Sequence, residues 1–176
     1  MNHDAYNDEY IADILRDSKS IAMIGASANT SRPSYFAMKY LIGKGYRVIP
    51  VNPGLAGQQI LGQDVVASLD DVPGPVEIVD IFRNSEAALE MTREAIRLKD
   101  KLGIKVIWMQ LGVRSDVAAA EAEAAGLEVV MNRCPKIEYG RLSGEIGWAG
   151  VNSGVISSVR PKLSPASVQD HRLADK

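Results

Sequence analysis

Short apolar segments rich in β-branched residues alternate, from Lys19 onward, with longer segments of helical period. Each apolar segment is too short for an ordinary helix and stops at a turn-compatible residue. This alternation is typical of a parallel sheet with helices on both faces, because both sides of each strand are then buried. The five predicted strands are Ser20–Ile24, Tyr46–Val51, Val76–Ile81, Lys105–Met109 and Leu127–Met131.

Helical segments lie between these strands and before the first one. Proline is tolerated in the first turn of a helix, where its missing N–H has no partner, and glycine commonly follows the last turn. On these grounds Pro33 begins one helix, Ser85 is the N-cap of the next and Gly126 ends the last. The predicted helices are Asp8–Asp17, Pro33–Gly43, Ser85 to the residue before Gly103, and Ser115–Ala125.

The apolar faces of two helices predict how they pack. A helix buries the face on which its apolar side chains gather. The helix that begins near Ser85 is expected to bury Leu89, Thr92 and Ile96. The N-terminal helix is expected to lie against an edge of the sheet through Ile11, Ile14 and Leu15.

The chain has the length of one compact domain. The predicted fold class is α/β, a Rossmann-like, doubly wound sheet of five parallel strands with helices on both faces. Residues 52–74 form the one long connection, within which Ile60–Leu61 adds a short extended piece. Residues 1–145 are assigned to the domain. Residues 146–176 are expected to form a polar C-terminal tail, partly disordered or docked on a neighbouring subunit through Trp148.

Composition narrows the classes of partner. The 20 Lys and Arg residues nearly balance the 22 Asp and Glu residues, so no basic field attracts nucleic acid or an anionic membrane. Cys134 is the only cysteine, which excludes an internal disulfide framework and a multi-thiolate zinc site and favours a reducing compartment. No apolar run approaches the roughly 20 residues of a membrane span, and the polar N-terminus is unlike a signal peptide. We expect a cytoplasmic protein.

The turn after the first strand is a candidate phosphate site. It runs from Gly25 to Arg32 and leads into the helix that starts at Pro33, a position where doubly wound folds bind nucleotides. Compared with the dinucleotide pattern G-x-G-x-x-G, only the first glycine is kept, because Ser27 and Thr30 occupy the other two places. A hydroxyl at position 27 can donate directly to a phosphate. The alternative is a tight turn that binds no ligand.

The end of the second strand bears on which nucleotide binds. An NAD site uses Asp or Glu there to hold the ribose hydroxyls, but this chain has Asn52 followed by Pro53 and Gly54. A carboxylate at this place would repel a ribose phosphate such as the one that coenzyme A carries. Its absence therefore favours coenzyme A over NAD.

Five stretches, taken in order, resemble a known family. They are Gly25-Ala26-Ser27, Arg32-Pro33-Ser34-Tyr35, the nine residues from Gly45 to Pro53, Asp80-Ile81-Phe82-Arg83, and the seven residues from Asn132 to Glu138. From Ser18 to Leu142 the chain resembles the stand-alone bacterial CoA-binding proteins. Their domain is similar to the N-terminal domain of the succinyl-CoA synthetase alpha subunit and of the ADP-forming acyl-CoA synthetases.

The resemblance implies a set of cofactor-binding residues. It places the CoA diphosphate on the turn at 25–27 and the adenosine at the end of the second strand. The end of the third strand closes the site beside them. In the synthetases a lysine follows the second-strand turn; Leu55 stands near that place here, and Arg32 is the candidate substitute. Arg83 is the expected main cation, with a salt bridge to Asp80 or Glu86 as its alternative role. The implied contacts are Gly25, Ala26, Ser27, Arg32, Pro33, Val51, Asn52, Pro53, Ile81, Phe82 and Arg83.

Cys134 is a further candidate at the same edge of the sheet. It follows the fifth strand, and the neighbouring cations Arg133 and Lys136 are expected to lower its pKa by favouring the thiolate. One interpretation is a mixed disulfide with the thiol of CoA. The other is a small buried residue in a strand-end turn.

The sequence favours binding over catalysis. Succinyl-CoA synthetase passes phosphate through a histidine in a second domain, whereas this chain has only His3 and His171, both in terminal segments. No nucleophile–base cluster or metal-ligand spacing appears. The main hypothesis is a non-catalytic CoA or acyl-CoA binding module, carrier or sensor. The alternatives are an NAD(P)-binding oxidoreductase or redox sensor, and a subunit of an ADP-forming acyl-CoA ligase. A partner enzyme chain fits these hypotheses, and a homodimer is compatible with them.

Overall fold

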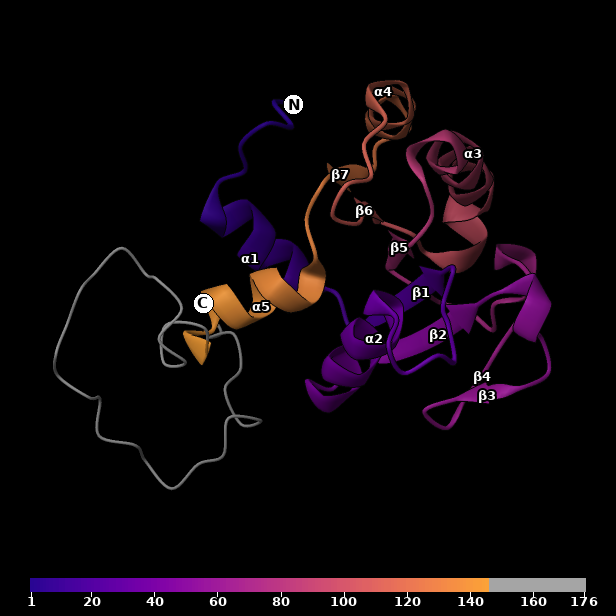
Figure 1. Cartoon of the computed structure of the whole chain (residues 1–176). Coiled ribbons are helices and arrows are strands. Elements are labelled where there is room, and N and C mark those ends of the chain that lie inside the picture. Colours follow the sequence, from indigo (N-terminus) through magenta and orange to yellow (C-terminus); the bar gives the residue numbers. More distant parts are fainter. Residues whose placement is uncertain (146–176) are drawn as a thin grey trace, which may run out of the picture.

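The computed structural model describes residues 1–145, so the predicted tail with Trp148 lies outside the described residues. Five parallel strands form one sheet in the order β2-β1-β5-β6-β7, which confirms the predicted fold class (Figure 1). In chain order this is 2-1-3-4-5, so the direction of winding reverses between β1 and β5, where open α/β sheets bind ligands. The strands are β1 Ser20–Ile24, β2 Arg47–Val51, β5 Ile78–Ile81, β6 Val106–Met109 and β7 Glu128–Val130.

Four of these strands are shorter than predicted, because backbone groups at their ends bond outside the sheet. The Tyr46 N–H donates to the carbonyl of Leu41 in the preceding helix (3.1 Å), and the Val76 N–H donates to that of Leu102 (2.7 Å). In the long connection the predicted extended piece is one arm of a small antiparallel hairpin, β3 Gln59–Ile60 and β4 Gln63–Asp64. Leu61 lies in its turn, at φ 51°.

The four predicted helices are present as α1 Asp8–Asp17, α2 Pro33–Gly43, α3 Ser85–Leu102 and α4 Asp116–Ala124. The predicted N-cap of α3 was wrong by one residue. Asn84 caps this helix through its side-chain oxygen, which accepts from the Ala87 N–H at 3.0 Å. The Ser85 hydroxyl instead accepts the Arg114 N–H at 3.0 Å and so ties α3 to the turn before α4.

A fifth helix, α5 Pro135–Leu142, was not predicted. Its buried residues include Glu138 and Gly140 beside Pro135 and Tyr139, so the sequence shows no apolar stripe. Ion pairs stabilise it where it meets α1: the Arg141 guanidinium lies 2.7 Å from the Glu138 carboxylate and 2.8 Å from that of Asp8. Figure 1 shows α5 and α1 lying side by side.

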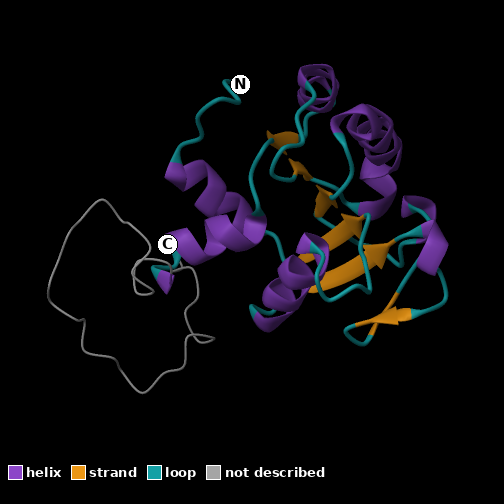
Figure 2. Cartoon of the chain, in the orientation of Figure 1, coloured by secondary structure: helices purple, strands orange, loops and turns teal. Residues whose placement is uncertain are grey.

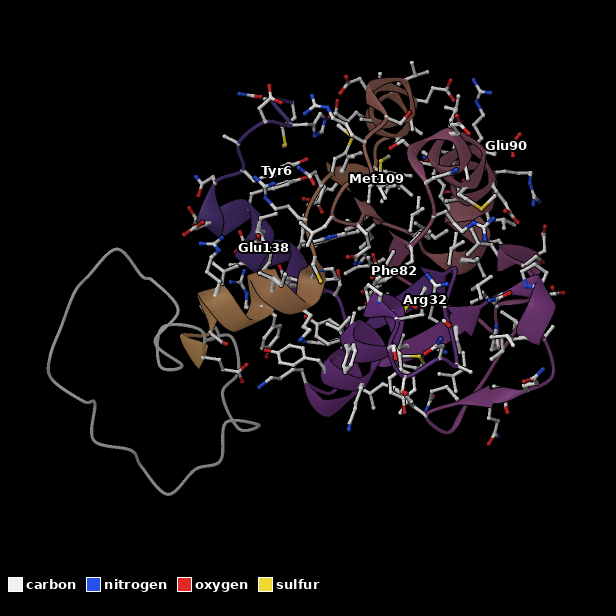
Figure 3. The ribbon with its side chains drawn as sticks, viewed as in Figure 1. Tyr6, Arg32, Phe82, Glu90, Met109 and Glu138 are labelled. Carbon is white, nitrogen blue, oxygen red and sulfur yellow. The ribbon has the colours of Figure 1, made fainter. Side chains whose placement is uncertain are left out.

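The sheet separates two apolar layers, with α1, α2 and α5 on one face and α3 and α4 on the other (Figure 2). Alternation along β1 supplies both layers, because Ile21 and Met23 face the first group of helices and Ala22 and Ile24 the second. Figure 3 shows Met109 of β6 in the interior and Glu90 of α3 at the periphery.

Only Thr92 of the predicted buried face of α3 is fully buried. Leu89 and Ile96 lie at the border of the apolar layer and are partly covered. Several of the side chains through which α3 packs on the sheet are small, and small side chains allow a close approach of the helix to the sheet. The buried residues of α3 are Ala88, Thr92, Ala95, Leu98 and Leu102.

The first helical segment covers the free edge of β7, as predicted. The Tyr10 hydroxyl, on α1, bonds both the N–H and the carbonyl of Val129 at 3.2 Å. The Tyr6 hydroxyl, just before α1, accepts the Met131 N–H at 2.7 Å. An open strand edge is thereby paired with side chains of the same chain. Within residues 1–145, no helix has the length and apolar character needed to cross a membrane.

Candidate functional site

The turn after β1 requires glycine at position 25. Gly25 has φ +82°, and a Cβ built on it would lie 2.6 Å from the carbonyl oxygen of Phe82 at the end of β5. Its N–H donates to the Val51 carbonyl of β2 at 2.9 Å. The ends of the three neighbouring strands therefore meet at this residue.

Polar side chains hold the turn and its neighbour in place. The Asn52 amide donates to the Ala26 carbonyl at 2.7 Å and accepts the Gly54 N–H at 2.9 Å, which joins the loop after β2 to the loop after β1. The Ser27 hydroxyl accepts the Asn29 N–H at 3.2 Å. It is half-buried and lines the pocket described below.

Two arginines provide positive charge beside this turn. Arg32 is the N-cap residue of α2 and Arg83 follows β5; both are exposed. Neither side chain forms a hydrogen bond or ion pair with another residue of the described part of the chain, so Arg83 makes no salt bridge to Asp80 or Glu86. Both guanidinium groups are therefore available to an anion.

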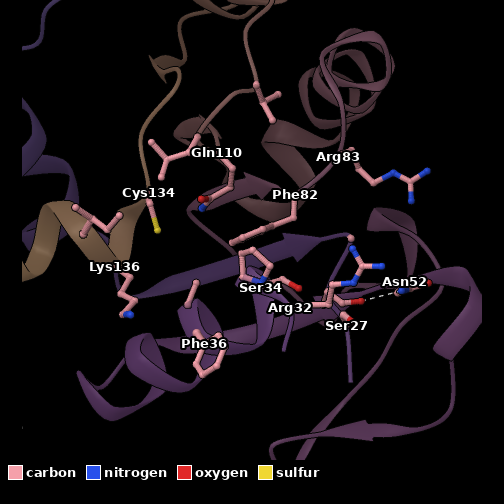
Figure 4. A pocket seen from close by; sticks show the side chains of 17 residues that line it. Ser27, Arg32, Ser34, Phe36, Asn52, Phe82, Arg83, Gln110, Cys134 and Lys136 are labelled. Carbon is pink, nitrogen blue, oxygen red and sulfur yellow. Dashed lines mark hydrogen bonds between the residues drawn. The ribbon is translucent and has the colours of Figure 1, made fainter. Parts of the chain in front are cut away.

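A pocket with a volume of about 670 Å³ opens at the carboxyl ends of the strands, between the first turns of α2 and α5. Figure 4 shows Ser27, Arg32, Asn52 and Arg83 on one side of this pocket, Cys134 and Lys136 on the other, and Phe82 between them. Of the predicted residues, those that line it are Gly25, Ala26, Ser27, Arg32, Pro33, Asn52, Phe82, Arg83 and Cys134.

Three predicted residues do not line the pocket. Val51 and Ile81 are strand residues whose side chains are buried in the layer beneath α3 and α4. Pro53 is exposed and begins a short 3-10 helix, Pro53–Leu55. Strand-end residues alternate between the two faces of the sheet, so only every second one can point toward a site on one face.

The turn before α5 brings Cys134 to the far end of the pocket. Asn132, at φ 52°, accepts the Gly112 N–H at 2.8 Å through its side chain, and the Trp108 indole donates to the Arg133 carbonyl at 2.8 Å. The β7–α5 turn is thereby fixed to the turn after β6 and to the core.

The predicted lowering of the Cys134 pKa was wrong. Burial raises the pKa of this thiol, and the nearby Asp80 carboxylate raises it further; the backbone N–H groups at the start of α5 act in the opposite direction without cancelling these effects. Of the two cations that were expected to lower this pKa, Lys136 acts in that direction but is outweighed, whereas the Arg133 guanidinium lies over the Tyr6 ring, 5.5 Å from the centroid. Cys134 is therefore a thiol rather than a thiolate at neutral pH.

Sequence reasoning missed a buried polar pair under the pocket. Gln110, at the end of β6, lines the pocket, and its amide nitrogen donates to both carboxylate oxygens of Asp80 at 2.8 and 3.1 Å. Burial raises the pKa of the Asp80 carboxyl to about 8. The sequence did contain a signal for Gln110 as a pocket residue: it directly follows a predicted strand, and the carboxyl ends of parallel strands share one edge of the sheet. The other pocket residues that were not predicted are Ser34, Phe36, Ala37, Leu111, Val113, Lys136 and Ile137.

The pocket thus has two chemically different ends. One combines a glycine turn, a helix N-terminus and two arginines without a side-chain partner in residues 1–145, which suits phosphate groups. The other combines a neutral thiol, an amide and mostly apolar side chains, with Lys136 as the one cation among the described residues that lines it, which suits a largely uncharged group. An elongated ligand that is anionic at one end and neutral at the other fits this arrangement.

Comparison with known proteins finds relatives that match most of the chain. An uncharacterised Bacillus subtilis protein, YneT, is 33% identical over 129 residues, covering 73% of this chain and 91% of that one. The structure of a hypothetical protein from Pyrococcus horikoshii OT3 is 38% identical, with a TM-score of 0.73, and the match covers 81% of this chain and 96% of that one.

A third likeness concerns the fold. The structure of a dinucleotide-forming acetyl-coenzyme A synthetase from Ca. Korarchaeum cryptofilum is 23% identical, with a TM-score of 0.54, over 69% of this chain and 28% of that one. The expected similarity to a domain of such synthetases is confirmed for the fold. Residues 19–140 match the family described as CoA binding domain, and the chain belongs to that family.

Proposed function

We propose that this protein binds coenzyme A or an acyl-CoA in the pocket and acts as a non-catalytic binding module, carrier or sensor. The observation that carries the proposal is the two-ended pocket in a chain of the CoA binding domain family. The diphosphate lies on the turn at Gly25–Ser27, between Arg32 and Arg83. The pantetheine passes Phe82, and the thiol reaches the end formed by Gln110 and Cys134.

The arginines contribute more to this binding than the helix N-terminus. A hydrogen bond between a charged side chain and a phosphate is worth about 1.5–3 kcal/mol, compared with about 0.3–1 kcal/mol for an exposed helix terminus. Neither guanidinium has to leave a carboxylate partner within the described residues before it binds. NAD is disfavoured because the end of β2 offers the amide of Asn52 rather than a carboxylate.

Isothermal titration calorimetry with CoA tests the proposal. We expect saturable binding that Arg83→Ala weakens about 10- to 100-fold. Arg93→Ala is the matched control, because Arg93 is an exposed arginine on α3 that pairs with Glu121 and lies outside the pocket. Absence of CoA binding, or tighter binding of NADH than of CoA, would refute the proposal.

A carrier or sensor of CoA acts together with a partner enzyme chain that loads or uses the ligand. We propose the cytoplasm as the compartment for this exchange, since free CoA thiols require reducing conditions. Copurification with the full chain, followed by identification of bound small molecules and proteins by mass spectrometry, tests whether CoA and a partner enzyme accompany the protein. Recovery of a nicotinamide dinucleotide in place of CoA would contradict the assignment.

We also propose that Cys134 can form a mixed disulfide with the ligand. The thiolate of Cys134 attacks CoA disulfide, a protein–CoA disulfide forms, one CoA thiolate leaves, and the protons exchange with solvent. The position of Cys134 at the end of the pocket opposite the arginines supports this. Because its pKa is raised, the reaction should be slow at neutral pH and faster as the pH rises.

Intact-protein mass spectrometry after incubation with CoA disulfide measures this reaction. The mass should rise by one CoA moiety, return to its original value with dithiothreitol, and stay unchanged in Cys134→Ser. The rate should increase between about pH 7 and about pH 9. An unchanged mass for the wild-type protein over this range would refute the disulfide and leave the proposal of reversible CoA binding intact.

A further inference from the structure

Exposed apolar side chains gather at one end of the pocket. Within residues 1–145 five large apolar side chains are exposed, and three of them line the pocket: Phe36 at 51%, Leu111 at 56% and Ile137 at 44%. They come from α2, from the turn after β6 and from α5, so no single amphipathic helix explains them. We call these three residues the apolar rim. Contiguous exposed apolar groups on a soluble protein commonly mark a binding site.

The apolar rim belongs to the thiol end of the pocket. Leu111 follows Gln110 directly, and Ile137 lies next to Lys136 in the first turn of α5, whose N-cap residue is Cys134. In Figure 4, Phe36 lies toward Lys136 and away from Arg83 and Asn52. A group attached to the thiol of a bound CoA would therefore meet the rim as it leaves the pocket.

Charges near the rim determine whether it suits a neutral or an acidic group. Lys136 is half-buried, and its ammonium lies over the Tyr40 ring, 6.0 Å from the centroid, a contact that directs the charge toward the ring without neutralising it. Asp80 is buried behind Gln110, and its raised pKa of about 8 leaves it uncharged at neutral pH, so it offers no charge to an acidic group. A carboxylate on the rim would lose hydration against exposed carbon, whereas a methylene chain would cover that carbon.

We infer that the apolar rim binds the hydrocarbon chain of a straight-chain acyl-CoA, so that the protein prefers an apolar acyl group of medium length over free CoA. This inference rests on the proposed function, because the rim can receive the chain only when the CoA moiety occupies the pocket. Each methylene that leaves water adds to the affinity, and an octanoyl group has six more methylenes than an acetyl group.

Calorimetry with CoA, acetyl-CoA, succinyl-CoA and octanoyl-CoA, all under reducing conditions, tests this inference. The dissociation constant of octanoyl-CoA should be at least about tenfold lower than that of acetyl-CoA. The dissociation constant of succinyl-CoA should be no lower than that of acetyl-CoA. Equal affinities for octanoyl-CoA and acetyl-CoA, or tightest binding of succinyl-CoA, would overturn it. If free CoA binds in either of these cases, the proposed function stands and only this inference fails. If none of the four ligands binds, both fail.

A pair of variants locates the acyl chain. In the double variant Phe36→Ser with Ile137→Ser, the ratio of the acetyl-CoA and octanoyl-CoA dissociation constants should fall toward one. Val117→Ser is the matched control, because Val117 is exposed at 58% on α4 and lies outside the pocket, and it should leave the ratio at the wild-type value. Retention of the full ratio in the double variant would show that the chain binds elsewhere.

Discussion

Gly25 determines how closely the carboxyl ends of β1, β2 and β5 approach one another. It combines a left-handed backbone conformation with a contact that leaves no room for a side chain, because the Phe82 carbonyl lies where a Cβ would stand. Other glycines with positive φ, such as Gly57, face open space. Position 25 is therefore restricted twice, by conformation and by volume.

Gly25→Ala separates these two restrictions when compared with Gly57→Ala. Gly57 has φ +81°, and no atom lies within 4 Å of the place that a Cβ would occupy, so its substitution costs only the left-handed backbone strain, about 1–2 kcal/mol. Gly25→Ala should lower the free energy of unfolding by clearly more than Gly57→Ala in urea titrations, and should also weaken CoA binding. Equal losses of stability would show that the close approach to Phe82 is relaxed without cost.

Asp80 makes stability depend on pH. Its folded-state pKa of about 8 lies above the unfolded value of about 3.9, so the folded protein holds an extra proton between these limits. Stability is therefore greatest below the unfolded pKa and falls as the pH rises toward the folded one.

Asp80→Asn should remove this dependence. Compared with the wild type, the variant should gain free energy of unfolding between about pH 4 and about pH 8, by a total on the order of a few kcal/mol. Urea denaturation at both pH values measures the difference. The same substitution removes the charge that Asp80 carries above its own pKa of about 8 and that raises the pKa of Cys134, so the reaction of this thiol with CoA disulfide should become faster above that pH. Parallel pH dependences in the two proteins would contradict the assignment of a buried, protonated Asp80.

Two helices, α1 and α5, are held in place by contacts between distant parts of the chain. The segment before α1 and α1 itself bond the edge strand β7 through tyrosine hydroxyls, and α5 forms where Arg141 reaches Asp8 of α1. Both ends of the described chain thus meet near β7, through contacts between segments more than 100 residues apart in the sequence.

Tyr6→Phe tests the contribution of the Tyr6 hydroxyl at the sheet edge. Its loss leaves the buried Met131 N–H unpaired and also removes the hydrogen bond between this hydroxyl and the His3 Nδ1 (2.9 Å), which together should cost about 1–3 kcal/mol of the free energy of unfolding. Tyr35→Phe is the control, because the Tyr35 hydroxyl forms no hydrogen bond with the described residues. Urea midpoints measured at one pH give both values. If the two variants lose the same stability, the Tyr6 hydroxyl does not pair the edge strand.

A local charge pattern acts within a nearly neutral molecule. The chain as a whole has a formal net charge of −2, so long-range attraction does not bring a polyphosphate to the surface. The attraction comes instead from Arg32 and Arg83 beside the turn, both of which are exposed and screened by salt.

CoA binding should therefore weaken several-fold when the ionic strength rises from about 0.05 M to about 0.5 M. The double variant Arg32→Ala with Arg83→Ala should bind more weakly at low salt and lose most of this dependence, whereas Arg93→Ala should retain it. Calorimetric titrations at three salt concentrations measure the slopes. A wild-type affinity that does not change with salt would show that the arginines do not contact the phosphates.

The local sequence pattern was sufficient to predict the strands, four of the helices and the turn at Gly25–Ser27. The alternation of apolar and helical segments, and the backbone preferences of proline and glycine, act over a few neighbouring residues. The location of the pocket at the strand ends followed from the parallel order of the sheet. The tertiary structure alone decided the rest. The Gln110–Asp80 pair joins residues 30 apart, and the Tyr6–Met131 bond joins residues 125 apart. The protonation of Cys134 depends on burial and on Asp80, which outweigh the donors next to it in the chain. Desolvation and contacts between distant segments exist only once the chain has folded, so they cannot be predicted from the residues that adjoin each position in the sequence.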